Sequence, residues 1–126
     1  MQTTQKSVMI IEDEPDAAEL FAEMMRLNGY RVLKAYSGSP AMALIAQERP
    51  DVIILDLMMP DVSGLDVLHG IRSDPRMASI PVVIVSAKAT AEDIRTGMEA
   101  GASIYLTKPV AYIDLKKAVD SLANPQ

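Results

Sequence analysis

The hydrophobic and polar positions of the chain follow two patterns that alternate five times. Short aliphatic runs of four or five residues are followed by longer stretches in which apolar residues recur every three or four positions. The middle runs are apolar on both faces of the pleat, which is typical of central strands in a parallel sheet covered by helices on both sides. The predicted strands are Val8–Ile11, Arg31–Ala35, Val52–Leu55, Pro81–Val85 and Ser103–Leu106.

The longer stretches predict helices that each have one apolar face. The second helix is expected to begin with Ser39 as N-cap and Pro40 in its first turn. Gly29 and Gly101 are expected to end the first and fourth helices. The apolar positions are Ala17, Leu20, Phe21, Met24 and Leu27 in the helix over residues 16–28, Leu65, Leu68 and Ile71 in the third helix, Ile94 and Met98 in the helix over residues 91–100, and Leu115, Ala118, Val119 and Leu122 in the fifth.

Five strand–helix units with short connections predict an α/β fold, because right-handed crossovers leave few topologies open. We expect one doubly wound five-stranded parallel sheet with five helices, in the flavodoxin-like strand order 2-1-3-4-5. The sequence shows no internal repeat and no linker. Residues 1–126 are therefore interpreted as a single domain, with an ordered core over about residues 6–122 and no output domain.

Composition narrows the class of protein. The chain has 126 residues, 12 Lys and Arg against 17 Asp and Glu, a net charge of −5 and no cysteine. The lack of cysteine excludes disulfides and fits a reducing compartment, and MQTTQKS does not have the pattern of a secretory signal. The apolar runs fall far short of the ~20 residues that cross a bilayer, and the acidic balance argues against a broad nucleic-acid surface. We therefore expect a cytoplasmic protein with no membrane or nucleic-acid partner.

Polar side chains follow the predicted strands at their carboxyl ends. Glu12 and Asp13 follow the first strand, and Asp56 follows the third. Ser86 follows the fourth strand, and Lys108 lies just beyond the fifth. Ligands bind at this edge of an open α/β sheet, where the strand order reverses between the first and third strands. The three carboxylates should therefore converge in one crevice.

Three close carboxylates repel one another by about 4 kcal/mol per pair, so the group needs a cation or a proton. Oxygen ligands favour Mg²⁺, with Mn²⁺ as a substitute, and do not favour zinc. Such a site suits phosphoryl transfer to a carboxylate. Asp56 is the better nucleophile candidate because Glu12 and Asp13 are adjacent and resemble metal ligands. Ser86 could donate its hydroxyl to a phosphoryl oxygen, and Lys108 could supply a positive charge.

Each of these residues also has an ordinary structural interpretation. Acidic residues after a strand are often helix N-caps or turn formers, a serine there is commonly a loop hydroxyl, and Lys-Pro is most often a surface turn. The coincidence of five compatible groups at one edge favours a functional site. The single histidine, His69, falls in the third helix and is interpreted as a solvated bystander.

The chain resembles receiver domains of the two-component response-regulator family over nearly its whole length. The segments that carry the resemblance, in the family's order and spacing, are IIEDE, ILDLMMPDVSGLD, SDPRMASIPVVIVSA and GASIYLTKP.

The resemblance implies a set of roles at the acidic site. Glu12, Asp13 and Asp56 would hold Mg²⁺ together with the backbone carbonyl of Met58. Asp56 would take a phosphoryl group from the phosphohistidine of a sensor kinase or a histidine phosphotransfer protein, and Ser86 would bind that group. The family more often has two aspartates where this chain has Glu12-Asp13, which shifts the metal slightly without removing it.

The resemblance also implies how the signal leaves the site. Lys108 would bind the phosphoryl group, and the Lys108-Pro109 peptide bond would be cis. Ser86 and Tyr105 would form a switch that reshapes the face of the fourth helix, fifth strand and fifth helix, where an unknown downstream protein docks. The plainer interpretation of Tyr105 is a half-buried tyrosine on an edge strand.

Two positions tune the lifetime of the acyl phosphate in the family, and they are Met58 and Lys88 here. Neither side chain positions water well, so we expect slow autodephosphorylation. The plainer interpretation is that both are solvent-facing and without effect.

Three other functions compete with a self-phosphorylating switch. A receiver-like module could bind partners without phosphorylation, but the intact acidic set disfavours it. An aspartyl-phosphate phosphatase would usually have a second acid two residues after Asp56, where this chain has Met58. A flavodoxin-like cofactor binder would need a Ser/Thr/Gly-rich first loop that the chain lacks.

Overall fold

The aliphatic runs form one parallel sheet in the computed structural model, which describes residues 5–125. The strand order is β2-β1-β3-β4-β5 and every pairing is parallel. This arrangement confirms the predicted order. The strands are β1 (Ser7–Ile11), β2 (Arg31–Ala35), β3 (Val52–Leu55), β4 (Val82–Ser86) and β5 (Ile104–Thr107).

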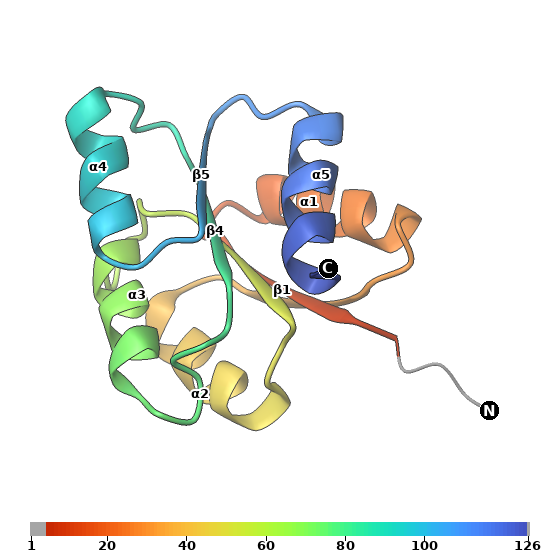
Figure 1. Cartoon of the computed structure of the whole chain (residues 1–126), viewed down its shortest axis with the longest axis horizontal. Helices are drawn as coiled ribbons and strands as arrows, with labels where there is room; N and C mark the ends of the chain where they lie inside the picture. The colour runs from red at the N-terminus through yellow and green to blue at the C-terminus, as the bar shows by residue number, and fades with distance from the viewer. Residues whose placement is uncertain (1–4, 126) are drawn as a thin grey trace.

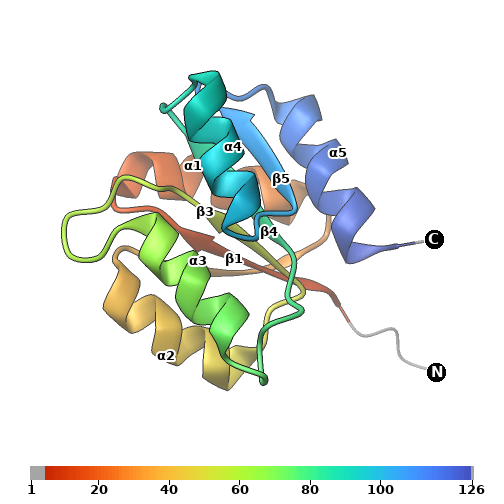
Figure 2. The ribbon, with the colours of Figure 1, turned by 60° about the vertical axis from the view of Figure 1, so that its left-hand side comes forward.

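Five helices cover the two faces of the sheet (Figure 1). Helices α1 and α5 pack on one face, and α2, α3 and α4 lie on the other, which the turned view shows most clearly (Figure 2). The three inner strands are buried along their whole length, which explains their continuous apolar sequences. The helices are α1 (Pro15–Leu27), α2 (Gly38–Glu48), α3 (Gly64–Ser73), α4 (Ala91–Glu99) and α5 (Tyr112–Ala123).

The buried face of α1 differs from the predicted stripe. Leu20 and Leu27 are 56% and 77% exposed, so the prediction that they face the core is wrong. Phe21 of the predicted stripe is buried, Ala17 and Met24 are partly buried against the core, and Ala18, Ala22 and Met25 complete the buried face. The three- and four-residue steps fit both sets.

The start of α2 is also corrected. Its N-cap is Ser37 and not Ser39, and the helix begins at Gly38. Pro40 lies in the first turn as predicted. The Ser37 side chain makes no capping hydrogen bond. The N–H groups of Gly38 and Ser39 donate instead to Asp61, a residue from a distant loop.

The first and fourth helices are each followed by a glycine with a positive φ angle, as predicted. Gly29 and Gly101 have φ values of 87° and 115°, a conformation that favours glycine. The expected boundaries of the ordered core, about residues 6 and 122, lie within the described residues, whereas residues 1–4 and 126 of the flanking segments lie outside them. Ala123, just beyond the expected core, belongs to α5. Over residues 5–125, none of the helices combines the length and apolar character needed to cross a bilayer.

Candidate functional site

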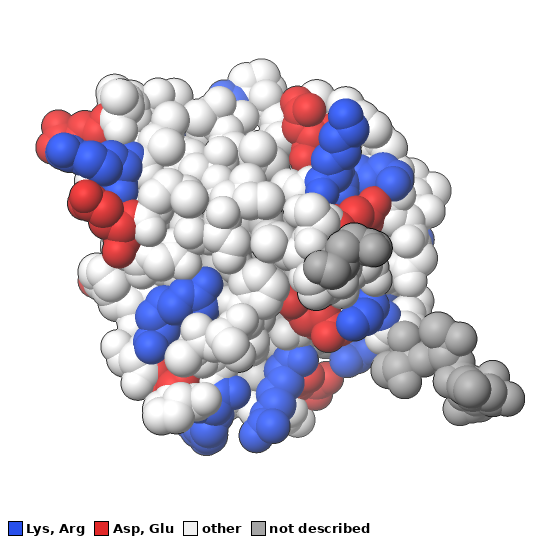
Figure 3. Space-filling model, viewed as in Figure 1, with Lys and Arg blue, Asp and Glu red and all other residues white. Residues whose placement is uncertain are grey.

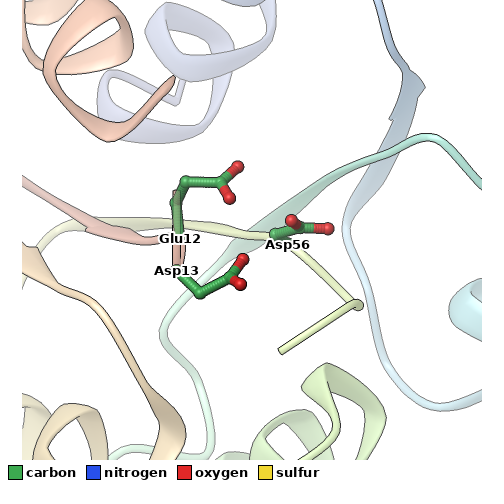
Figure 4. A group of neighbouring side chains, drawn as sticks. All are labelled: Glu12, Asp13 and Asp56. Carbon is green, nitrogen blue, oxygen red and sulfur yellow. The ribbon is translucent and has the colours of Figure 1, made fainter. Parts of the chain in front are cut away.

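The sheet places the acidic residues on two neighbouring strands at one edge. Ile11 pairs with Leu55, so Glu12 and Asp56 leave β1 and β3 side by side. The Asp56 N–H donates to the Ile11 carbonyl at 3.0 Å and extends the pairing into the site. Glu12, Asp13 and Asp56 each offer a carboxylate oxygen, and these oxygens lie within 4.8 Å of one another (Figure 4). The sequence-based expectation that they converge is therefore met.

The three carboxylates differ in burial and in their backbone contacts. Glu12 and Asp56 are 2% and 6% exposed, whereas Asp13 is half-buried. The Glu14 N–H donates to Glu12 Oε2 at 3.2 Å. The Met58 N–H donates to Asp56 Oδ1 at 3.1 Å and fixes the orientation of this carboxylate. The backbone thus holds the two buried carboxylates from opposite loops.

Lys108 is the cation that contacts this group. Its ammonium Nζ lies 2.7 Å from Glu12 Oε1 and 3.4 Å from Asp56 Oδ2. The Lys108 N–H donates to the carbonyl of Ser86 at 2.9 Å, and the Lys108-Pro109 peptide bond is cis. One ammonium against three carboxylates leaves a formal charge of −2.

The pKa values of Glu12 and Lys108 are both raised, for different reasons. Burial raises the pKa of Glu12, and the nearby Asp56 carboxylate adds to the rise, although hydrogen bonds from Lys108 and the Glu14 N–H oppose it. Burial acts to lower the pKa of Lys108, but the hydrogen bond to Glu12 and the charge of Asp56 outweigh it and raise the pKa. Both shifts favour the protonated form of the group, through burial at Glu12 and through the neighbouring carboxylates at Lys108.

The donor set fits a hard divalent cation. All three side chains offer oxygen, and no sulfur or imidazole ligand belongs to the group. Mg²⁺ and Mn²⁺ prefer such ligands, and a charge of +2 balances the formal −2 that Lys108 leaves. The residues present therefore could bind a metal ion of this class.

Ser86 is the last residue of β4, at the same edge, and does not follow the strand as predicted. Leu55 pairs with Ile84, so β4 brings Ser86 next to the end of β3. Ser86 is fully buried, and its hydroxyl oxygen accepts the Lys88 N–H at 3.2 Å. The Tyr105 hydroxyl donates to the Lys88 carbonyl at 2.7 Å. Lys88 thus links the hydroxyl at the strand end to the half-buried tyrosine of edge strand β5.

The remaining sequence-based candidates lie at the margin of the site. The Met58 side chain is 53% exposed, and the Lys88 side chain is exposed as well. His69 is exposed on α3 and does not belong to the group of potential metal ligands. Asp61 is not among the predicted site residues, and its contacts with α2 have no local sequence signal.

Comparisons with known proteins agree with this geometry. The sequence profile of the response regulator receiver domain matches residues 8–120. PilH of Pseudomonas aeruginosa is 35% identical over 115 residues, which cover 91% of this chain and 95% of PilH. The probable transcriptional regulatory protein TcrX of Mycobacterium tuberculosis is 43% identical over 103 residues, which cover 82% of this chain but 43% of TcrX. The chain thus spans less than half of that relative and nearly all of PilH.

Solved structures show the same fold. The receiver domain of the Francisella response regulator 1452 superposes with a TM-score of 0.88 at 30% sequence identity, covering 94% of this chain and 97% of that one. The family match, the strand order and the acidic group at the strand ends lead to one conclusion. This chain is a receiver domain of the response-regulator family.

Proposed function

We propose that Asp56 accepts a phosphoryl group from a phosphohistidine on a sensor kinase or phosphotransfer protein, or from a small phosphodonor. A carboxylate oxygen of Asp56 attacks phosphorus in line, and the bond from phosphorus to the donor nitrogen breaks with its electron pair returning to that nitrogen. The imidazole, already protonated on its other ring nitrogen, leaves as a neutral group. With a small acyl phosphate as donor, the P–O bond breaks and a carboxylate leaves. The product is an aspartyl phosphate. The chain would thus catalyse its own modification as a signalling switch and would not act as a turnover enzyme.

The observation that carries this proposal is the gathering of Glu12, Asp13 and Asp56 around one point beside Lys108. The three carboxylates, with the backbone carbonyl of Met58, would hold Mg²⁺. When bound, that ion supplies positive charge beside the oxygens of the transferring group.

The protein groups around Asp56 prepare it for this reaction. The Met58 N–H fixes the carboxylate, so little reorientation is needed before attack. Lys108 can move its ammonium from the carboxylates to a phosphoryl oxygen, because it already lies between Glu12 and Asp56. The Ser86 hydroxyl can donate to another phosphoryl oxygen, since its present contact uses it as an acceptor.

We further propose that Ser86 and Tyr105 transmit the modification. A Ser86 hydroxyl drawn toward the phosphoryl group disturbs its contact with Lys88, and Lys88 also accepts from Tyr105. A bias of about 1.4 kcal/mol changes a two-state ratio tenfold, which one charge-assisted hydrogen bond can supply. The change would reach the face formed by α4, β5 and α5.

That face suits the docking of a downstream protein. Its centre, over β5, is uncharged, and charged side chains gather over α4 and α5 on either side (Figure 3). An uncharged centre with a charged rim is a common composition of protein interfaces. PilH and DivK, the latter named a polar-differentiation response regulator, are relatives of nearly the same length as this chain.

Intact-mass spectrometry tests the proposal. The protein is incubated with a small acyl phosphate in Mg²⁺ or in chelator, beside the variants Asp56→Ala and Asp114→Ala. Asp114 is an exposed carboxylate on α5 and serves as the matched control. The wild type and Asp114→Ala should gain one phosphoryl group in Mg²⁺ only, and Asp56→Ala should gain none. Equal uptake by Asp56→Ala would refute the proposal, and a protein that works without phosphorylation would show no uptake at all.

A further inference from the structure

The loop between β3 and α3, residues 56–63, is closed tightly at its base. The Gly64 N–H donates to the Leu57 carbonyl at 2.9 Å. A β-carbon on Gly64 would lie 2.5 Å from Leu57 Cα and would overlap the Asp56 carbonyl oxygen, so only glycine fits there. Inside the loop, the Met58 N–H bonds to the Asp56 carboxylate. The two ends of the loop are therefore fixed beside Asp56.

The far side of the loop is held by a different element. The carboxylate of Asp61 accepts the Gly38 N–H at 3.0 Å through Oδ1 and the Ser39 N–H at 3.2 Å through Oδ2. These are the first two residues of α2. A β-carbon on Gly38 would lie 2.8 Å from Val62 Cβ, which shows how closely the loop lies on the helix.

The Asp61 contacts are of a strong kind. A carboxylate that bridges two free N–H groups at a helix N-terminus makes charge-assisted hydrogen bonds and also faces the positive end of the helix dipole. The N–H groups of Gly38 and Ser39 accordingly lower the pKa of the exposed Asp61 carboxyl, although a small loss of hydration opposes them. The side chain of Ser37, the local N-cap, makes no capping hydrogen bond, so Asp61 caps the helix in its place.

We propose that Asp61 is a positioning residue for the phosphoacceptor: it fastens the β3–α3 loop to the start of α2 and thereby holds Met58 against the Asp56 carboxylate. The consequence for the reaction rate rests on the proposed function of Asp56. The position of the loop does not rest on that proposed function, because it can be measured in the protein without a metal ion or a phosphoryl group.

The chain offers a variant that separates loop positioning from helix capping. Asp61→Ala removes both. Adding Ser37→Asp to it gives α2 a local cap, because aspartate is a preferred N-cap and position 37 already has extended backbone. The double variant Ser37→Asp/Asp61→Ala should therefore regain the Tm lost by Asp61→Ala, while its loop stays unfastened. Ser37→Asp alone is the matched control and should leave the phosphorylation rate unchanged.

Two measurements are made on all four proteins. Amide hydrogen exchange by NMR, in chelator, reports the Met58 N–H, and we expect it to exchange about 10-fold faster in Asp61→Ala and in the double variant. The initial rate of phosphorylation in Mg²⁺ should fall about 10-fold in the same two proteins, the size typical when a group that orients a ligand is lost.

The outcomes decide between positioning and capping. Slow Met58 exchange and a normal rate in the double variant would show that Asp61 only caps α2, and would overturn the proposal. Unchanged Met58 exchange in Asp61→Ala would overturn it as well. If the wild type takes up no phosphoryl group, the proposed function fails, and the exchange data still decide whether Asp61 positions the loop.

Discussion

The aromatic ring of Tyr105 lies directly against the backbone of Gly97 in α4. A β-carbon at position 97 would lie 2.8 Å from two ring carbons and 3.0 Å from Ile84 Cδ1, distances that ordinary packing does not allow. The hydroxyl of the same tyrosine donates to the Lys88 carbonyl. Tyr105 is therefore held at both ends, by the helix and by the loop that precedes it.

Gly97→Ala should destabilise the protein by about 1–3 kcal/mol, because the new methyl group forces the ring or the helix to move. The change would otherwise favour folding, since alanine is about 1 kcal/mol better than glycine inside a helix. Urea unfolding measures the difference. NMR should also show a shifted Tyr105 ring and a weakened contact with Lys88.

Gly70→Ala in α3 is the matched control. A β-carbon there would lie 3.0 Å from Met42 Cε, the free end of a flexible side chain that can move away. This variant should be as stable as the wild type or more stable by up to about 1 kcal/mol. Equal stabilities of the two alanine variants would contradict the packing described for Gly97.

Removal of one carboxylate from the acidic site should stabilise the metal-free protein. Asp13→Asn removes a half-buried charge from the group of three, so we expect about 1 kcal/mol of added stability in chelator after solvent screening. In Mg²⁺ the wild type should gain Tm with metal concentration, as a ligand of the folded state requires, and Asp13→Asn should lose most of that gain. Differential scanning calorimetry in both buffers tests this, with Asp114→Asn as the control. A wild-type Tm that does not change with Mg²⁺ concentration would contradict metal binding at this site.

Alkaline pH should weaken the contact between α5 and the start of β2. Burial, a hydrogen bond to Asp120 and the charge of that carboxylate raise the pKa of Tyr30 above its usual 10.0. Unfolded protein releases this proton near pH 10 while folded protein keeps it. The contribution of the protonated Tyr30 hydroxyl to the free energy of unfolding is therefore complete below pH 10. It is lost as the pH rises toward the pKa of Tyr30 in the folded protein.

Tyr30→Phe should remove up to about 1.4 kcal/mol per pH unit from that alkaline slope, the value for one proton. Lys116 contributes in the same direction, because Asp120 raises its pKa too, so part of the slope remains in the variant. Urea unfolding between about pH 9 and 11 measures both slopes, and identical slopes would contradict the role given to Tyr30.

Sequence reasoning reached the parts of the fold that depend on local pattern. Apolar runs located the strands, and the polar residues at the ends of four of them marked the functional edge, since parallel strands end together. The burial of Leu20 was mistaken because one helical spacing fits two neighbouring faces of α1. The start of α2 was mistaken for a different reason. Ser39-Pro40 is a good local signal, but Asp61 caps the helix from 22 residues away.

The contacts within the site could not be predicted from the pattern of the sequence either. Two examples are the hydrogen bond from Met58 to Asp56 and the packing of the Tyr105 ring against Gly97. Both depend on how loops and helices pack in three dimensions. The expectation of a cis Lys108-Pro109 bond came from the family resemblance alone, and the bond is cis in the structure.

Met58→Asn should shorten the lifetime of the phosphorylated protein. Met58 lies two residues after Asp56, its backbone N–H bonds to the Asp56 carboxylate, and its exposed thioether side chain cannot orient an attacking water as an amide can. We expect a several-fold faster loss of phosphate, followed by mass spectrometry after the phosphodonor is removed. Lys88→Ala is the companion variant and should act in the same direction, because we propose that the exposed Lys88 ammonium pairs with the phosphoryl oxygens. Rapid loss from the wild type, unchanged in Met58→Asn, would contradict this account.

The identity of the modified residue tests the central claim most directly. An aspartyl phosphate is reduced by borohydride to homoserine, so the phosphorylated protein can be reduced, digested and sequenced by mass spectrometry. We predict homoserine at position 56 in protein treated with phosphodonor and Mg²⁺, and none when a chelator is present. Homoserine at position 13 or 51 instead, or phosphorylation that proceeds equally well in chelator, would show that the three carboxylates do not form the site described.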